Sequence, residues 1–220
     1  MRILGLIGII AACMGTAAGA MGLAGNGDIR HVERDLLAFN HINFTGVGDV
    51  FVHLGNEYRV GINVDSNIEP YIVTNVRDGT LYISTNLERY KNLRNPIKFK
   101  LRFDVYTRDI ESVSHMGMGN IELIDMNIDA LTLNHSGVGF FTVTGKGTQF
   151  VVQMKGVGDI NSENFAVKRA SITNIGVGKV KVWAEELLEV FVHPFGISSM
   201  EYRGDPTKLV SNNWHKTIKM

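Results

Sequence analysis

Apolar and polar residues alternate along most of the chain, and Gly-x-Gly interrupts the alternation at regular intervals. The motif occupies residues 117–119, 137–139, 156–158 and 176–178, and residues 196–198 keep its first glycine. The first glycines are 20, 19, 20 and 20 residues apart. Alternation with a period of two is typical of strands with one buried face, and a fixed long period indicates stacked units. The pattern predicts an all-β solenoid with coils of about 20 residues.

The residues that flank each Gly-x-Gly also keep their register. Four residues before the first glycines stand Val113, Leu133, Val152, Ile172 and Val192. Four residues after them stand Ile121, Phe141, Ile160, Val180 and Met200. Each repeat is therefore interpreted as a strand, a Gly-x-Gly corner, a second strand and a polar corner. Residues 184–189 have good helix propensity, but propensity is weaker than the repeat, so we expect a strand there.

The N-terminal half is less regular, and we expect it to form a β-rich cap. One Gly-x-Gly stands at 46–48, an alternating strand is predicted at 60–64, and Asp78-Gly79 indicates a hairpin turn. From 97 to 106 apolar and polar residues alternate completely. A cap protects the end of a solenoid from pairing with other chains. We assign residues 21–107 to this cap and 108–220 to the repeats.

Residues 1–20 have the features of an export signal. Arg2 precedes an apolar stretch at 3–12, which is short for a membrane-spanning helix. Cleavage after Ala20, at a small-x-small site, would release a soluble protein. The segment 10–13 resembles a bacterial lipobox, which would leave Cys13 lipidated at the new N-terminus. An uncleaved anchor is the third alternative.

Charge and cysteine content narrow the function classes. The chain has 22 Lys plus Arg and 22 Asp plus Glu, so its formal net charge is zero. Nucleic-acid binders usually carry a basic excess, so we expect no nucleic-acid partner. Cys13 is the only cysteine, which excludes disulfides and thiolate metal sites from the body of the protein. No cofactor motif is present, because no helix is expected after any Gly-x-Gly.

Two groups of polar residues near the corners are candidate metal sites. Asp49, Asn120 and Asp159 follow Gly-x-Gly, but Phe140 and other residues interrupt the column, so we expect these side chains to close their own turns. His115 and His135 precede their corners by two residues and are expected to lie about 5 Å apart on adjacent coils. Their column is predicted to continue with Met154, Asn174 and Pro194, which supply no further ligands, so we expect a polar ladder and no metal.

The best candidate binding patch is a cationic stripe. Lys98, Lys100 and Arg102 alternate with apolar residues on the last strand of the cap. Such a stripe could meet anionic polysaccharide or lipid head groups, or it could be a solvated strand face. Candidate acids for a lyase or hydrolase do not fall in one column, and we predict no catalytic residues. They are Asp109, Glu111, Glu122, Asp125, Asp129, Asp159 and Glu163.

The chain resembles a bacterial family described as putative auto-transporter adhesin, head GIN domain. The resemblance is carried by Gly25-Asn26-Gly27, by the residues 46–50 and 76–83, and by the serial corners, and it extends from about residue 25 to 215. It implies one continuous exported domain, often a lipoprotein, with a right-handed parallel β-helix of pectin-lyase-like outline. It also implies a role in adhesion and no catalytic residues. The corners at Phe140, Lys179 and 196–198 depart from the family pattern.

Three functions remain open from the sequence. The first is a non-enzymatic binding module of the envelope or cell surface, with a glycan or an envelope protein as partner and a membrane contact only through an N-terminal lipid. The second is a β-helix enzyme that acts on polysaccharides. The third is a structural scaffold of the periplasm. Location in the periplasm, at the outer membrane or on the cell surface, and the oligomeric state, are left open.

Overall fold

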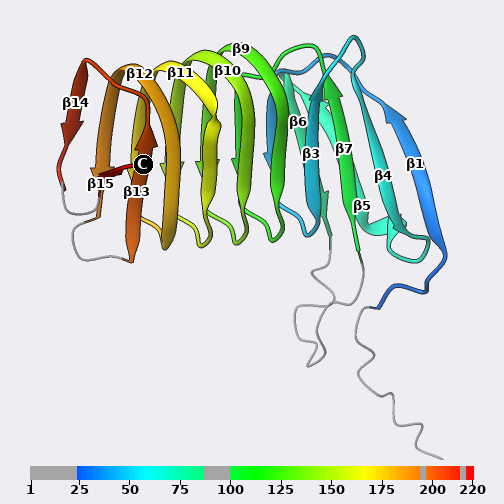
Figure 1. The fold of residues 1–220 in the computed structure, drawn as a ribbon. Helices are drawn as coiled ribbons and strands as arrows, with labels where there is room; N and C mark the ends of the chain where they lie inside the picture. Colours follow the sequence, from blue (N-terminus) through cyan, green and yellow to red (C-terminus); the bar gives the residue numbers. More distant parts are fainter. Residues whose placement is uncertain (1–23, 87–99, 194–196, 214–216) are drawn as a thin grey trace, which may run out of the picture.

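The structure is a computed structural model that describes residues 24–86, 100–193, 197–213 and 217–220. It is an all-β solenoid of about five turns, with a single turn of 3-10 helix at Glu69–Tyr71. The coils lie side by side in a row, with the N-terminal strands at one end and the C-terminal strands at the other (Figure 1). The predicted fold class is therefore confirmed.

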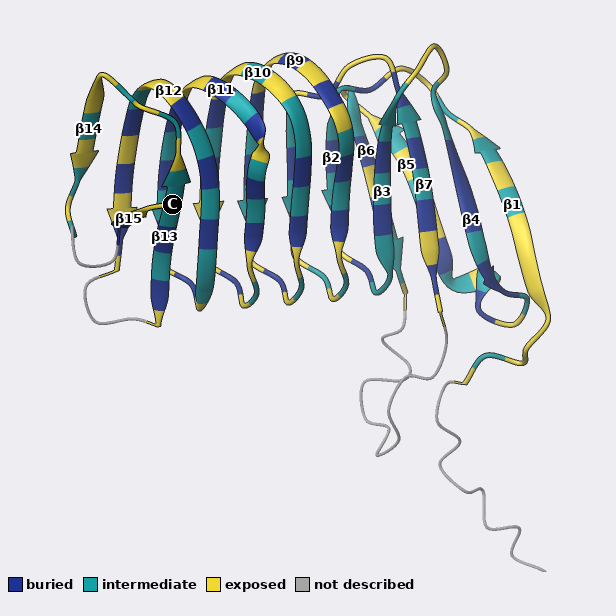
Figure 2. Cartoon of the chain, in the orientation of Figure 1, coloured by how far each residue is buried: buried dark blue, intermediate teal, exposed yellow. Residues whose placement is uncertain are grey.

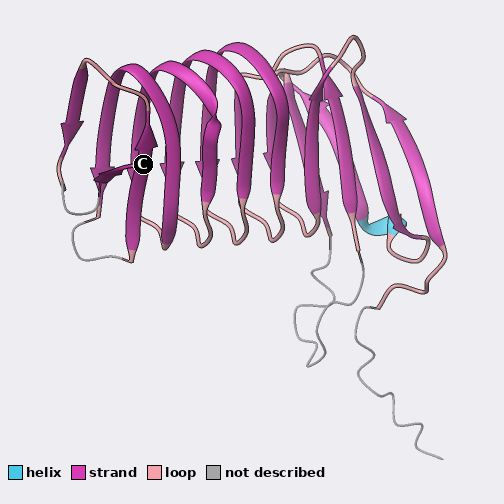
Figure 3. Ribbon diagram, in the orientation of Figure 1, coloured by secondary structure: helices cyan, strands magenta, loops and turns pink. Residues whose placement is uncertain are grey.

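The repeats form four long strands that stack in parallel. These strands are β9 (Ile121–His135), β10 (Phe141–Met154), β11 (Ile160–Asn174) and β12 (Gly178–Val192). Each bends near its middle, so that its two halves belong to two walls of the solenoid (Figure 3). The stack ends with β13 (Ser198–Arg203), β14 (Lys208–Ser211) and β15 (Thr217–Lys219). Residues 184–189, the stretch with helix propensity, lie inside β12 as predicted.

The N-terminal half contributes both parallel coils and antiparallel strands. Its elements are β1 (Ile29–Asp35), β2 (His41–Phe44), β3 (Asp49–Leu54), β4 (Arg59–Asp65), β5 (Ile72–Arg77), β6 (Thr80–Thr85), β7 (Arg102–Thr107) and β8 (Ser112–His115). One wall runs β1-β4-β7-β3-β9, and the other runs β5-β6-β2-β8-β9. Because β2 and β3 pair in parallel with β8 and β9, the regular stack begins before residue 108. Strands β1, β4 and β5 pair antiparallel and close the end.

The core is a set of side-chain columns that run through the stack. In both halves of β9, β11 and β12, buried residues alternate with more exposed ones (Figure 2). The column after the corners contains Ile121, Phe141, Ile160, Val180 and Met200, all of them buried and in register. Large rings fill the widest places, and Phe150 packs edge-on against Phe165 with 5.3 Å between ring centroids. Burial of these columns on neighbouring coils is the main stabilising term of the fold.

The predicted column of apolar residues before the corners is wrong at its last member, Val192. Val190, and not Val192, pairs with Ile172. Val192 pairs with Asn174, the place that the sequence assigned to Pro194, which itself lies outside the described residues. Six residues separate Val192 from Ser198, whereas four separate Asn174 from Gly178. The last corner is thus two residues longer than the others. An alignment of the coils on Gly196 therefore assigns Val192 to the column, two residues after the correct member, Val190.

The Gly-x-Gly corners need glycine for two reasons. At Gly139 φ is +146°, in a region that other residues rarely adopt. A Cβ there would also lie 1.8 Å from the carbonyl oxygen of Gly119 on the preceding coil. The backbones of adjacent corners are joined by isolated bridges between the middle residues, from Val47 to Val177. The corners can stack only because no side chain stands between them.

Candidate functional site

Of the two described members of the predicted cationic stripe, Arg102 is paired within the protein and Lys100 is exposed. Lys98 lies outside the described residues, and Lys100 is exposed just before β7. Arg102 donates two hydrogen bonds to Asp104, from Nε to Oδ2 at 2.8 Å and from Nη2 to Oδ1 at 2.6 Å. Its guanidinium carbon also lies 3.7 Å above the ring centroid of Phe51. Arg102 is therefore already paired within the protein and is a poor free cation.

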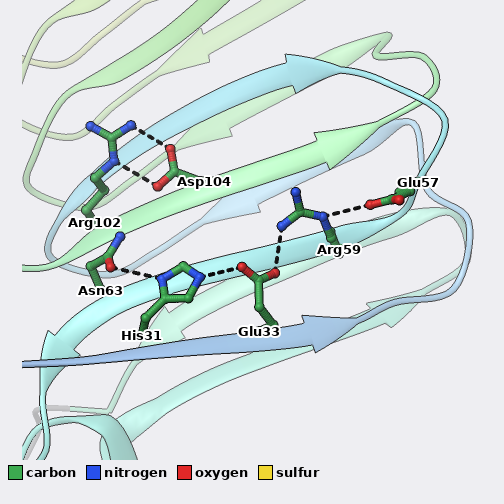
Figure 4. Close-up of polar contacts among 7 residues, drawn as sticks. All are labelled: His31, Glu33, Glu57, Arg59, Asn63, Arg102 and Asp104. Atoms are coloured by element: carbon green, nitrogen blue, oxygen red, sulfur yellow. Dashed lines mark hydrogen bonds and ion pairs between the residues drawn. The ribbon is translucent and has the colours of Figure 1, made fainter.

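The same outer surface carries a connected polar network, which we call the cap face (Figure 4). His31 contacts Asn63 through Nδ1 at 2.9 Å and Glu33 through Nε2 at 2.5 Å. Arg59 Nη1 donates to Glu33 Oε2 at 2.7 Å, and its Nε donates to Glu57 Oε2 at 2.8 Å. These residues come from β1 and β4 and from the turn that precedes β4. The cap face thus holds its charges in mutual pairs and covers the antiparallel end of the solenoid.

Hydrogen bonds in the cap face shift the ionisation of its members. The hydrogen bond from Arg102 lowers the pKa of Asp104, and the hydrogen bond from Arg59 lowers the pKa of Glu33. Acceptance by Asn63, and then by Glu33, raises the pKa of His31. The side chains of His31, Glu33 and Arg102 are about half exposed, so their pairs add little to stability. The arrangement is charge-balanced and offers no preference for an anion.

A hollow among the described residues lies where the cap meets the regular stack. It has a volume of about 800 Å³ and is shallow. Its walls come from the starts of β2 and β8 and from the bends of β9 and β10. Polar side chains dominate the lining: His41, Asp109, Glu111, Ser112, Asn127, Asp129, Thr132, Lys146 and Thr148. We call this feature the polar hollow.

Four polar side chains of the polar hollow are held in place by hydrogen bonds. His41 Nδ1 lies 2.8 Å from Ser112 Oγ, and Asn40 Nδ2 donates to Glu111 Oε1 at 2.6 Å. Asp109 accepts from the backbone N–H of Ile110 at 2.8 Å. The hollow therefore presents donors and acceptors on a rigid base, which suits a ligand rich in hydroxyl groups.

Three of the candidate acids converge in the polar hollow, which the column analysis missed. Asp109 and Glu111 precede β8, and Asp129 lies at the bend of β9, so they reach the hollow from different parts of a coil. No sequence periodicity brings them together. All three are exposed. A glycosidase acid is usually shielded from water so that it keeps its proton near neutral pH, and this shielding is missing here.

The predicted histidine pair forms, but inside the core. His115 and His135 are fully buried, their rings are parallel at a centroid distance of 5.1 Å, and their Nδ1 atoms are 3.0 Å apart. Phe44 stacks on the other side of His115 at 5.4 Å. Burial lowers the pKa of His115 to about 4 and also lowers the pKa of His135. Both rings are therefore neutral near pH 7.

The contacts of the pair determine its tautomers. His135 Nε2 lies 3.4 Å from the carbonyl oxygen of Val157, which can only accept, so Nε2 carries the proton. His135 Nδ1 is then the acceptor, and His115 Nδ1 donates to it. His115 Nε2 is left as a buried lone pair without a partner. In the part of the chain that the structure describes, no three metal-ligating side chains are arranged so that they could hold a metal ion. The burial of both rings makes the pair part of the core.

We expect from the sequence that the polar residues after Gly-x-Gly close their own turns, and this expectation is wrong. Each instead accepts a hydrogen bond from the backbone of the next coil. Asp49 Oδ1 accepts from Asn120 N at 2.8 Å, and Asp159 Oδ1 accepts from Lys179 N at 2.8 Å. Asn120 Oδ1 in turn accepts from Phe140 N at 3.1 Å. These side chains join neighbouring coils, because the backbone N–H after each corner points toward the side chain on the preceding coil.

Cys13 and the whole predicted export signal lie outside the described residues. Their processing therefore stays a prediction. Within the ranges described above, no helix is long and apolar enough to cross a membrane.

Most of the chain matches a known protein family. The family model described as putative auto-transporter adhesin, head GIN domain, matches residues 38–206. The chain belongs to this family. Among curated proteins none matches. The resemblance noted from the corner motifs is thus confirmed over most of the chain, including the first coil at 41–54.

Solved structures share the head GIN domain fold. A protein from Bacteroides fragilis named a putative adhesin has a TM-score of 0.73 and 22% sequence identity, over 90% of this chain and 99% of the other. A protein from Parabacteroides distasonis named a putative lipid binding protein has a TM-score of 0.52 and 17% identity, over 91% and 100%. At such low identity these likenesses establish the fold alone.

Proposed function

We propose that this head GIN domain is an exported, non-enzymatic binding module of the cell envelope or cell surface. In this proposal a glycan, or a glycan-bearing envelope protein, binds in the polar hollow. The observation that carries the proposal is the hollow itself, a shallow site of about 800 Å³ with fixed hydroxyl, amide, imidazole and carboxylate groups. Adhesive function in the family and the names of similar structures support the same class of role.

The charge of the polar hollow favours one kind of glycan. Three carboxylates face it, together with Lys146 as the cation and with His41. This imbalance disfavours uronic-acid polymers and favours neutral sugars or sugars with free amino groups. An anionic ligand would instead be expected at the cationic stripe. The charge of the ligand therefore distinguishes binding at the polar hollow from binding at the cationic stripe.

The exposure of the three acids supports a non-enzymatic role. Catalysis would need one carboxyl group that keeps its proton and a second that is ionised beside the scissile bond. The carboxyl groups of Asp109, Glu111 and Asp129 are all exposed to water. They are suited to accept hydrogen bonds from sugar hydroxyl groups, and a polysaccharide-degrading enzyme stays the second candidate because three acids do share one hollow.

Calorimetric titration of the full chain with three hexasaccharides tests the proposal. The probes are chitosan hexamer with free amino groups, its fully acetylated form, and oligogalacturonate. We expect the first two to bind and the third to fail. Asp129→Asn and Glu111→Gln should weaken binding, whereas Lys100→Ala, on the cationic stripe, should leave it unchanged.

Two results would overturn the proposal. Binding of oligogalacturonate alone, lost in Lys100→Ala and Arg102→Ala, would place the site on the cationic stripe. New reducing ends or unsaturated products from any probe would make the protein an enzyme. A chain that binds no sugar but retains a specific envelope protein in a pull-down would support the scaffold function.

Export and anchoring are tested separately. Intact-mass analysis of the N-terminus from native cells distinguishes the alternatives. A diacylated or triacylated Cys13 means a lipoprotein, cleavage after Ala20 means a diffusible protein, and an intact leader means an uncleaved anchor.

A further inference from the structure

The Gly-x-Gly corners expose an uninterrupted row of apolar side chains, which we call the corner ridge. Its members are the middle residues of the motif, and the exposed fractions are 49% for Met118, 52% for Val138, 48% for Val157, 42% for Val177 and 80% for Ile197. Backbone bridges between the middle residues of neighbouring corners, from Val47 to Val177, fix the spacing of the row at that of adjacent strands, about 4.8 Å. The ridge runs along one whole edge of the solenoid.

Residues next to the corner ridge widen it. Met116, Phe140 and Ile175 lie one place outside the glycines and are exposed by 55%, 55% and 41%. Together with the ridge they make up eight of the sixteen large hydrophobic residues that are exposed among the described residues. Single exposed apolar residues are ordinary, but a contiguous concentration marks an interaction surface.

The shape and charge of the corner ridge indicate the type of partner. The ridge is convex, because it follows the tight turns, and glycine backbone flanks the apolar side chains of Met118, Val138, Val157 and Val177. Exposed charges beside it have both signs, as with Lys155 and Asp159. Such a surface suits shallow insertion into a broad, deformable apolar phase, and it does not need a charged partner.

The described chain begins at this same edge. Ile29 pairs with Asp65, Asn63 pairs with Arg102, and Arg102 pairs with Asp49, the residue after the first corner. Asp65 also accepts a hydrogen bond from Gly27 N at 2.7 Å, and Asn67 Nδ2 donates to the carbonyl oxygen of Ala24 at 2.9 Å. These contacts hold the start of the domain on the corner side (Figure 1).

We propose that the corner ridge rests on the surface of a lipid bilayer and holds the solenoid side-on against it. The proposal rests on the envelope location given above and extends the expectation of a membrane contact through a lipid alone. An anchor at Cys13 would leave eleven residues before Ala24, which span at most about 36–40 Å. A lipid anchor with two or three acyl chains is stable by itself, so the corner ridge would orient the tethered solenoid against the bilayer.

Site-specific fluorescence on the full chain tests this contact independently of the N-terminus. In a Cys13→Ser background, a polarity-sensitive dye is attached at Val157→Cys or at Val210→Cys, two valines exposed by 48% and 47%. Val210 lies in β14 on a side wall, and Leu37→Cys provides a second control at the opposite edge. Vesicles of phosphatidylcholine, with or without brominated acyl chains, are then added.

We expect a blue shift and bromine quenching at position 157, and neither effect at 210 or 37. The double variant Val138→Ser/Val157→Ser should bind phosphatidylcholine vesicles about tenfold more weakly, because two half-exposed valines lose their transfer free energy. High salt should not change the binding. Thermal melting verifies that the variants are folded.

Several results would overturn the proposal. Vesicle binding without quenching at 157 would mean that residues 1–23 alone hold the chain, and equal quenching at all three positions would mean that no edge is preferred. Concentration-dependent self-association that Val138→Ser/Val157→Ser abolishes would show that the corner ridge pairs two copies. None of these outcomes depends on whether sugars bind the polar hollow, so the two proposals fail separately.

Discussion

The two edges of each coil are built on different principles. At the corner edge, Gly119, Gly139, Gly158 and Gly178 all have φ between +134° and +146°, and each stacks on the carbonyl group of the glycine before it. At the opposite edge the long strands bend through different residues, and their pairing shifts register between Thr142 and Thr144 and between Ser162 and Ala166. One edge sets the spacing of the coils, and the other absorbs differences in their length.

This difference explains why β10 tolerates a shorter coil. It has 14 residues, whereas β9, β11 and β12 have 15. The missing residue is taken up at the bend, where Gly145 pairs with Met126 after a register shift. The column at Ile121, Phe141 and Ile160 next to the corner stays in register. Apart from the last corner, which is two residues longer, the bend edge is therefore the place where the coils vary, and the polar hollow lies on it.

The comparison is tested most severely by Gly139→Ala. The new Cβ would meet the Gly119 carbonyl oxygen at 1.8 Å, and φ would stay strained. Strain and overpacking together should lower the free energy of unfolding by about 3–5 kcal/mol. Gly147→Ala at the bend edge, where the nearest atom is 2.9 Å away, should cost about 1 kcal/mol. Urea unfolding measures both, and equal costs would refute the distinction between the edges.

Acid should weaken the corner edge next, through the buried histidines beneath it. The pKa of His115 is about 4 in the folded protein and near 6.5 when it is unfolded. The unfolded chain takes up the proton first, so stability falls as pH drops from about 6.5 to 4. At 1.36 kcal/mol per pH unit, this interval corresponds to about 3 kcal/mol. Unfolding curves across this range measure it, and His115→Phe should flatten the dependence. A slope unchanged in that variant would assign the effect to other groups.

A smaller effect is expected from the hydrogen bonds that join coils. Asp159→Ala removes a charged acceptor from the Lys179 N–H and should cost about 1–1.5 kcal/mol. The matched change at the bend is Thr144→Val, which removes the acceptor of the Asp125 N–H at 2.9 Å. Both hydrogen bonds are exposed to water, but the acceptor lost at the bend is a neutral hydroxyl group, so the cost there should stay near about 0.5 kcal/mol. Chemical denaturation of the two variants decides, and a reversed order would contradict the comparison.

The smallest effect is expected for Asp125→Gly. Asp125 has φ of +52° at the bend, where a glycine adopts the same backbone without strain but loses entropy on folding. These terms nearly cancel, and the melting temperature should change by less than about 2 °C. A large destabilisation would show that the bend is as demanding as the corner.

Local repetition explains which parts of the fold could be predicted. Each Gly-x-Gly corner needs positive φ at its second glycine, so the glycines are visible as a period, and the buried columns follow from alternation. Alternation cannot detect a shift of two residues, which is why Val192 was exchanged for Val190. The burial of His115 was also readable in principle, because Phe44 and Met154 share its column.

Contacts between distant segments could not be predicted in this way. The polar hollow needs Glu111, Asp129 and Lys146 to meet from three coils, and no spacing records their meeting. Arg102 reads as one cation in a stripe, yet its partner Asp104 lies on the same strand face two residues on. The partner was visible, but the pattern of alternation assigns a face and not a pairing.

The order of strands in the cap has a consequence for how the chain can be shortened. Strand β7 is inserted between β3 and β4, although both precede it in the sequence. Removing coils from the C-terminus trims the stack one rung at a time. At the other end, deleting β1 to β4 strips the partner from β7 and exposes its hydrogen-bonding edge. Truncation should therefore lower stability gradually from the C-terminus and abruptly from the N-terminus. During biosynthesis, residue 107 must be made before the N-terminal end of the solenoid can close.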